Sequence, residues 1–338
     1  MGAGRHRAYS ILGTSFGGCG NVAGMRIKIG RPDLGGYAGR FDLPPAAGPF
    51  GVTFFGVAGL LFTDGTDAVM TDGFFSRPSL LRVALGRIAP DGRRIDAGLE
   101  RLGHGSRLHA VAAVHTHFDH VLDSPTVALR TGAALVGGAS AANVGRGAGL
   151  AEDRLHVVVP GEPRRYGAFT LTFVESAHCP PDRFPGVISA PVVPPVRASA
   201  YRCGEAWSIL AGHDGGRTAL VQGSAGFVPG ALDGREADVA FIGVGGLGGC
   251  GEAYLRDYWR HTVRAVGARR VVLIHWDDFF RPLDRPLRAL PYAGDDLDLT
   301  MRVLGGLAGR DGVGLHLPTL WRRSDPWEAA CGSSSWST

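Results

Sequence analysis

Four side chains of types that bind transition metals follow one apolar run of the sequence. The run covers residues 111–114 and leads directly into His115, His117, Asp119 and His120. It predicts a buried strand, and a strand end carries alternate side chains on one face, so His115 and His117 can reach one ion together. We expect Asp119 and His120 in the following turn, facing the same hollow. Imidazole and carboxylate suit zinc, and three protein ligands with an open position are typical of catalytic zinc.

The alternative interpretation is a polar, histidine-rich turn without a metal. Four ligand-type residues within six positions, directly after a buried strand, are costly to bury unless they are paired or hold an ion. The sequence therefore favours a metal site.

The pattern His-x-His-x-Asp-His after an apolar strand resembles the signature of the metallo-β-lactamase superfamily. The resemblance covers roughly residues 50–320 and is most specific at 115–120. It implies an α/β fold, a four-layer αβ/βα sandwich.

Two more strand-end histidines complete the ligand set that this resemblance implies. His178 follows the alternating segment 169–174, and His275 follows the apolar run 271–274. The resemblance implies that His178 completes a three-histidine position and that His275 contributes to a second metal position. The implied ligands are His115, His117, His178, Asp119, His120 and His275.

Three aspartates are expected to support these ligands. Asp72 ends a segment similar to the opening hairpin of the superfamily, and we expect it to hydrogen-bond the metal loop. An ordinary strand-end aspartate that caps a turn is the alternative. Asp277 and Asp278 are close enough to His275 in sequence to support it or to replace a ligand.

The sequence departs from the superfamily pattern at Gly223. Most members with two metals have a bridging aspartate at this strand end, whereas this chain has Gly223 between Gln222 and Ser224. Three possibilities stay open: a single metal, a second ion held weakly, or a carboxylate from elsewhere, such as Asp214. We therefore expect one or two zinc ions.

The expected chemistry is hydrolysis by a metal-bound hydroxide. Three neutral imidazoles leave zinc its full charge, which lowers the pKa of a bound water toward about 7. Asp119 would orient or deprotonate that water or ligate a second ion, and His275 or a metal-bound water would protonate the leaving group. A small ester, lactone, amide or phosphodiester with some hydrophobic character is the expected substrate.

Two other functions remain as alternatives. One is an iron-dependent oxidoreductase on the same scaffold. The other is a non-catalytic or weakly active binding protein that has lost the bridging aspartate. The scaffold alone does not decide between them, because one fold carries many chemistries.

Strands alternating with helices position these residues, which is typical of α/β architecture. Period-two and apolar runs predict the strands, and capping and amphipathic patterns predict the helices. We predict strands at 52–55, 59–62, 68–72, 111–114, 135–136, 157–159, 169–174, 206–210, 218–221, 238–242 and 271–274. We predict helices at 79–88, from 125 with Asp123 and Ser124 as cap, at 139–144 and at 252–266, then a closing helix and strand within 281–320.

Two loops border the expected site. Residues 179–200 carry six prolines, which exclude a central strand, and we expect a wall or lid of the substrate pocket or a surface crossover. Residues 243–251 are glycine-rich without the P-loop ending, so a flexible bordering loop is favoured over a phosphate site.

Composition indicates a globular protein with no nucleic-acid partner. The 338 residues are 45% hydrophobic and 20% charged, with a net charge of +4 and no dense basic run. No apolar segment reaches the length of a membrane span, so stable membrane insertion is not expected. The oligomeric state is open.

Five cysteines without Cys-x-x-Cys spacing argue against a disulfide framework. We expect a cytoplasmic protein, and the alternative is export through a lipoprotein-like signal ending at Cys19. The expected organisation is an irregular extension at 1–50, a hydrolase domain at 51–320 and a tail at 321–338. Seven histidines are expected to be surface or satisfied core residues: His6, His104, His109, His156, His213, His261 and His316.

Overall fold

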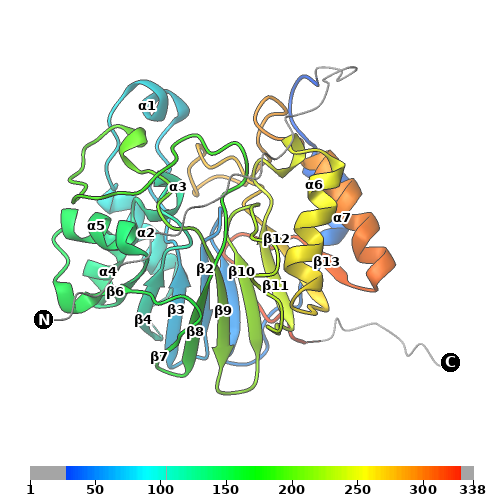
Figure 1. Ribbon diagram of the computed structural model, residues 1–338, viewed down its shortest axis with the longest axis horizontal. Helices are drawn as coiled ribbons and strands as arrows, with labels where there is room; N and C mark the ends of the chain where they lie inside the picture. Colours follow the sequence, from blue (N-terminus) through cyan, green and yellow to red (C-terminus); the bar gives the residue numbers. More distant parts are fainter. Residues whose placement is uncertain (1–27, 104, 329–338) are drawn as a thin grey trace, which may run out of the picture.

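Two β-sheets of seven strands each form the middle of the molecule, with helices on both outer sides (Figure 1). The computed structural model describes residues 28–103 and 105–328. The expectations for residues 1–27, including Cys19, and those for His104 and residues 329–338 lie outside the described part. The predicted α/β class and four-layer arrangement are confirmed.

The first sheet has the strand order β14-β1-β2-β3-β4-β5-β6. Its strands are β1 (Gly51–Phe54), β2 (Leu60–Thr63), β3 (Asp67–Thr71), β4 (Arg107–Ala112), β5 (Ala134–Gly137), β6 (Leu155–Val157) and β14 (Arg323–Ser324). The second sheet has the order β13-β12-β11-β10-β9-β8-β7. Its strands are β7 (Pro163–Tyr166), β8 (Phe169–Glu175), β9 (Trp207–His213), β10 (Thr218–Gln222), β11 (Val239–Gly243), β12 (Arg270–Ile274) and β13 (Gly314–His316).

The helices lie outside the sheets. The α-helices are α1 (Leu80–Leu85), α2 (Gly92–Leu102), α3 (Phe118–Val121), α4 (Ser124–Thr131), α5 (Ala139–Gly147), α6 (Glu252–Trp259) and α7 (Leu297–Asp311). The short 3-10 helices are Leu34–Arg40, Glu152–Arg154, Ala198–Ala200 and Leu247–Gly249, and a π-helical turn, Arg260–Arg264, extends α6. Helices α4 and α5 pack on β4, β5 and β6, while α7 packs on β13 and against α6.

The two sheets repeat one pairing scheme. From β1 to β6, two antiparallel pairs precede three parallel pairs. From β8 to β13, the same succession occurs. Each half therefore brings the carboxyl ends of its parallel strands to one edge, which is where polar side chains after strands can meet.

Alternating side chains divide the apolar residues of the first sheet between two cores. Leu60 and Phe62 belong to the core between the sheets, whereas Leu61 belongs to the core under the outer helices. Phe62 meets Phe241 of the second sheet with ring centroids 5.6 Å apart. The period-two alternation in the sequence thus builds two layers at once.

Several elements differ from those expected. The strand predicted at 111–114 ends at Ala112, so His115 and His117 lie in the loop beyond it. The strand predicted at 157–159 is β6, which ends at Val157. The 11-residue helix α2 was not predicted. Arg323–Ser324, in the segment 321–338, form β14, which pairs with β1.

The expected cap of α4 is also wrong in detail. Asp123 occupies the capping position, but its side chain makes no capping hydrogen bond there. It accepts instead from Phe75 N at 2.8 Å and from Ser76 N at 2.6 Å. Asp123 therefore ties α4 to the loop after β3.

No helix in the described part of the chain is both long and apolar enough to cross a bilayer.

Candidate metal centre

The six expected ligands come from three loops at one edge of the two sheets. Residues 115–120 follow β4, His178 follows β8, and His275 follows β12. The structure brings all six together in two groups of three. The start of β9 and the residues before it hold the loop after β4, because Thr116 N donates to Cys203 O at 2.8 Å and Trp207 N donates to Val114 O at 2.8 Å.

The first group consists of His115, His117 and His178, whose ligand atoms lie within 4.8 Å of one another. Both ring nitrogens of His115 are buried without a hydrogen-bond partner in the described part of the chain. His178 directs Nδ1 to the carbonyl oxygen of Cys179 at 2.7 Å, which leaves Nε2 free with a lone pair. An ion would satisfy these buried nitrogens, so the donor set fits a metal.

Burial keeps this group neutral. It lowers the pKa of His115 well below the usual range, and it lowers that of His178 to about 4, with the neighbouring histidines acting in the same direction. The pKa of His117 is also lowered, mainly by burial, although Asp119 and Asp182 oppose this. A neutral imidazole is the form that ligates a metal.

The second group consists of Asp119, His120 and His275. His120 Nε2 lies 3.2 Å from His275 Nε2, and Asp119 Oδ2 lies 3.6 Å and 3.3 Å from these two atoms. Two ligands of a tetrahedral zinc ion, each about 2.0–2.1 Å from it, are about 3.3 Å apart. The three atoms therefore have the mutual spacing of ligands to one ion.

Asp72 holds His120 in place. Its Oδ2 lies 2.7 Å from His120 Nδ1, and its Oδ1 accepts from Val114 N at 3.0 Å. Burial would lower the pKa of His120, but Asp72 and then Asp119 raise it. A carboxylate on Nδ1 selects the tautomer whose Nε2 can face a metal. Asp72 thus makes the hydrogen bonds to the metal loop that the sequence led us to expect.

The neighbouring histidines His120 and His275 keep Asp119 ionised. Burial would raise its pKa, but His120 and His275 lower it below the usual range. Asp119 is therefore ionised at neutral pH.

The sandwich with repeated pairing order, the outer helices and the two ligand groups at the shared edge identify the architecture. The chain has the metallo-β-lactamase fold. A scan against protein-family models gives no match, and neither does a comparison with curated proteins.

The chain is similar to several solved structures. Igni18, a metallo hydrolase from Ignicoccus hospitalis, is 13% identical with a TM-score of 0.49, over 80% of this chain and 95% of that one. YhfI from Bacillus subtilis, a metallo-β-lactamase fold protein, is 14% identical with a TM-score of 0.44, over 82% and 95%. CmlA, a diiron β-hydroxylase from Streptomyces venezuelae, is 14% identical with a TM-score of 0.48, over 81% and 54%.

Sequence reasoning missed Asp182 and Cys203, which lie beside His117. The three residues form a further group of converging ligand atoms, with Asp182 Oδ1 3.1 Å from His117 Nε2. Burial and then Asp182 raise the pKa of the Cys203 thiol to about 12, so the thiol is protonated. Asp182 stands four residues after His178, and that spacing is the signal that could have found it.

Asp277 and Asp278 differ from their expected role. Asp277 accepts from Val57 N at 2.8 Å and pairs with Arg77 Nη1 at 2.7 Å, in full burial. Asp278 pairs with Arg288, 2.9 Å away. Within the described residues neither carboxylate hydrogen-bonds a candidate ligand, so both hold the loop after β12 rather than a ligand ring.

Val114 occupies the space that a side chain at Gly223, the position of the absent bridging aspartate, would need. A Cβ atom at Gly223 would lie 2.4 Å from Val114 Cγ2, so the fold here has room only for glycine. Gln222 Nε2 donates to Ser176 Oγ at 2.9 Å, and Ser224 Oγ accepts from Cys179 N at 3.0 Å. The side chains of Gln222 and Ser224 therefore hydrogen-bond neighbouring residues of the protein and do not replace the bridging aspartate.

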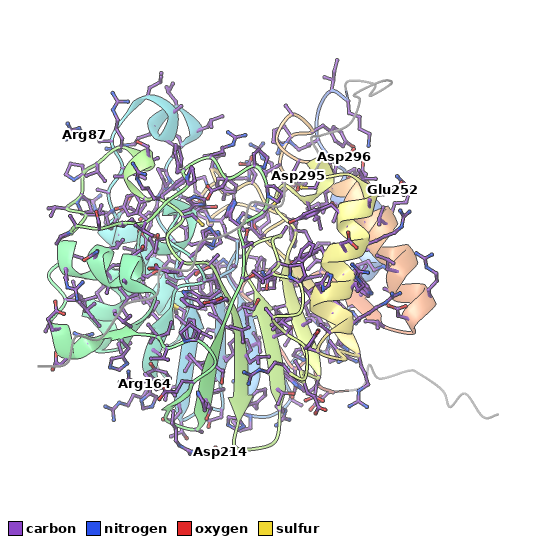
Figure 2. All side chains as sticks on the ribbon, in the orientation of Figure 1. Arg87, Arg164, Asp214, Glu252, Asp295 and Asp296 are labelled. Carbon is purple, nitrogen blue, oxygen red and sulfur yellow. The ribbon has the colours of Figure 1, made fainter. Side chains whose placement is uncertain are left out.

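Asp214 does not replace the bridging carboxylate. It lies at the turn between β9 and β10, paired with Arg165, at the end of the sheets opposite Arg87 (Figure 2). The expectation that it could reach the site is wrong, because the hairpin carries it away from the ligand edge.

The two bordering loops contact the candidate ligands. Phe184, in the proline-rich segment 179–200, lies with its ring centroid 6.2 Å from that of His117. In the glycine-rich loop, a Cβ at Gly245 would lie 2.4 Å from His275 Nδ1, so glycine permits the close approach. The proline-rich segment is thus a wall of the site.

Of the other histidines, five in the described part make polar contacts elsewhere. His109 contacts Asp67, His156 contacts Tyr166, His213 contacts Asp64, His261 contacts Arg260, and His316 contacts Asp42.

Proposed function

We propose that the protein is a metal-dependent hydrolase, with zinc as the metal and a small ester, lactone, amide or phosphodiester as the substrate. The observation that carries this proposal is the convergence of Asp119 Oδ2, His120 Nε2 and His275 Nε2 within 3.6 Å of one another. Two imidazole nitrogens facing each other beside a carboxylate form a cation site, and the three-histidine group lies next to it, with the His115 and His120 rings 3.8 Å apart.

The chain's own residues would hold and orient the reacting groups. His115, His117 and His178 would hold one ion, and Asp119, His120 and His275 a second. A divalent ion at such ligands supplies an acidified water at neutral pH and stabilises negative charge that develops on the substrate. Asp119 directs Oδ2 to the two imidazoles, which leaves its Oδ1 to accept a hydrogen bond from the attacking water.

Two aromatic rings support a substrate with a hydrophobic part. Phe184 adjoins His117, and Phe279 has its ring centroid 5.8 Å from that of His275. Phe279 also contacts Phe118, at 6.3 Å between centroids. We propose that these rings flank the apolar portion of the substrate, which adds binding energy and excludes water from the reacting bond.

The experiment pairs elemental analysis with a panel of probes. The protein is purified without added metal, and its zinc and iron per chain are measured. Hydrolysis of 4-nitrophenyl acetate, a γ-lactone and bis(4-nitrophenyl) phosphate is then followed. We expect bound zinc and turnover of at least one probe, with the His178→Gln and His275→Gln variants at least about 100-fold slower.

A matched variant controls for the loss of any histidine. His213→Gln removes a ring that contacts Asp64 instead of a candidate ligand, and it should retain both metal and activity. Iron in place of zinc would instead favour the oxidoreductase. A protein with no metal, or with zinc but no turnover of any probe, would contradict the hydrolase.

A further inference from the structure

Helix α1 exposes an apolar surface that the fold leaves uncovered. Leu80, Leu81 and Leu85 expose 59%, 70% and 72% of their surface. No residue of this helix is buried. A helix in a globular protein normally buries its apolar side chains against the core, and large exposed apolar patches mark interaction sites.

The proline-rich segment extends this surface. Val187 and Val193 expose 60% and 64%. The segment is joined to the chain just beyond α1 by two backbone hydrogen bonds between Ile88 and Val196, of 2.7 and 3.1 Å. We call the five exposed side chains the apolar rim: Leu80, Leu81, Leu85, Val187 and Val193.

The apolar rim lies at the end of the molecule that carries the candidate metal centre. Segment 73–90 begins directly after Asp72, and segment 179–200 begins directly after His178. Figure 2 places Arg87, two residues beyond α1, at the end of the sheets opposite Asp214. A partner on the apolar rim would therefore sit next to the mouth of the site.

The charge around the apolar rim is mainly positive. Segments 73–90 and 183–204 contain no aspartate or glutamate, and Asp91, Asp182 and Glu205 directly flank them. Five of their arginines are exposed, and within the described part of the chain none of the five is in an ion pair: Arg82, Arg87, Arg183, Arg197 and Arg202. The remaining arginine, Arg77, is buried on Asp277.

We propose that the apolar rim docks on the surface of an anionic lipid bilayer. A bilayer with anionic lipids has an apolar interior under a negatively charged headgroup layer. The exposed leucines can enter the boundary of the apolar interior, while the unpaired arginines contact the anionic headgroups. Docking would hold the metal centre at the membrane surface. The docking surface does not depend on the proposed reaction.

Vesicle sedimentation with the full chain tests this directly. Vesicles of phosphatidylcholine alone are compared with vesicles containing about 30% phosphatidylglycerol. We expect binding to the anionic vesicles, at least about tenfold weaker binding to the neutral ones, and weakening as salt is raised. The Leu81→Asp/Leu85→Asp double variant should lose at least about tenfold in partitioning, because each leucine no longer enters the bilayer.

The matched control is Leu129→Asp, which places the same substitution on α4 at a residue that is 43% exposed. It should bind like the unmodified protein. Hydrolysis of a soluble probe should be unchanged in all three proteins, so loss of docking and loss of activity are separable.

Two results would overturn the proposal. One is the absence of anionic-vesicle binding at low salt. The other is self-association of the unmodified protein in sedimentation velocity, lost in the double variant, with no vesicle binding by either protein. That result would make the apolar rim an interface between two copies of this chain.

Discussion

The Asp182 carboxylate lies beside His117. Its Oδ1 is 3.1 Å from His117 Nε2, and His117 also belongs to the group formed with His115 and His178. The charge of Asp182 raises the pKa of His117 against the effect of burial, and a carboxylate beside a ligating histidine raises the basicity of the ring. Asp182 is therefore a positioning residue for His117.

Replacing Asp182 by asparagine should weaken metal binding. We expect the Asp182→Asn variant to lose about 10–100-fold in metal affinity, because the amide is a weaker and uncharged acceptor. Competition with a chromogenic chelator measures the affinity without relying on turnover. Asp214→Asn, in the hairpin paired with Arg165, is the control and should bind metal normally. Equal affinities for the two variants would remove Asp182 from the site.

The close contact at Gly223 makes a second residue-level prediction. Gly223→Ala should lower the free energy of unfolding by about 1–3 kcal/mol, because its Cβ would lie 2.4 Å from Val114 Cγ2. Urea denaturation measures this loss. In the Gly223→Ala/Val114→Ala double variant the clash is relieved. Its loss of unfolding free energy should therefore be smaller than the sum of the losses in the two single variants. Simple additivity would mean that Val114 is not the obstacle.

The sequence predicts single residues well where a local pattern marks them. All six expected ligands follow strands or lie in one tight motif, and the structure gathers all six. Val114 carries no such mark, and Asp182 carries only its spacing of four residues after His178. Their importance arises from neighbours distant in the chain, and only folding brings Val114 against Gly223.

Asp123 connects two elements, the loop after β3 and helix α4. It is fully buried and accepts from Phe75 N and Ser76 N. Burial raises its pKa to about 6, although the hydrogen bonds with Ser76 and Phe75 oppose the shift. The folded-state pKa is then above the unfolded value, so this group contributes stability below the unfolded pKa and loses it as pH rises through about 6.

The Asp123→Asn variant should lack this pH dependence. Between pH 5 and pH 7.5 the unmodified protein should lose roughly 1–1.5 kcal/mol from this group, and the variant should not. The difference in unfolding free energy between the two proteins should therefore narrow as pH rises. Parallel stability curves from urea titrations across this range would contradict the assignment.

A buried ion pair links the loop after β3 to the loop after β12. Arg77 and Asp277 are paired at 2.7 Å with fully buried side chains, and Asp277 also accepts from Val57 N. Asp277→Asn leaves the Arg77 charge unpaired, so we expect a loss of about 3–5 kcal/mol of unfolding free energy. The neighbouring Asp278 carboxylate is also buried, but its partners Arg288 and Arg31 are partly exposed, so Asp278→Asn leaves their charges in contact with water and should cost clearly less. Similar losses for the two variants would argue against the buried pair.

At the level of elements, apolar runs are predictive and very short segments are not. The strands β4, β8, β11 and β12 are predictable because their residues are buried and alternate or form apolar runs. Helix α2 carries a helical signal that the prediction missed, because Ile95, Leu99 and Leu102 recur at helical spacing and pack on one core, with Asp91 as the cap. Strand β14 has two residues, and pairing with β1 defines it.

The candidate metal centre joins the two halves of the molecule. Four of the expected ligands follow β4 in the first sheet, while His178 and His275 follow strands of the second. Each group of three combines both halves, since His178 meets His115 and His117, and His275 meets Asp119 and His120. An ion at either position would act as a cross-link between the sheets.

Removing metal should therefore destabilise the whole molecule. Ligand present at about 100 times its dissociation constant stabilises a fold by about 2.7 kcal/mol, which corresponds to a melting temperature several degrees higher for a chain of this size. We expect EDTA followed by gel filtration to lower the melting temperature by about 5 °C and zinc to restore it. The His178→Gln/His275→Gln variant, which removes the second sheet's ligand from each group, should melt at one temperature with or without EDTA.

Hydrogen exchange would locate the effect of metal removal. Faster exchange should appear in the loops after β4, β8 and β12, while exchange in the turn around Asp214 stays unchanged. A melting temperature indifferent to EDTA in the unmodified protein, after elemental analysis shows that the metal has gone, would mean that the two halves hold together without an ion.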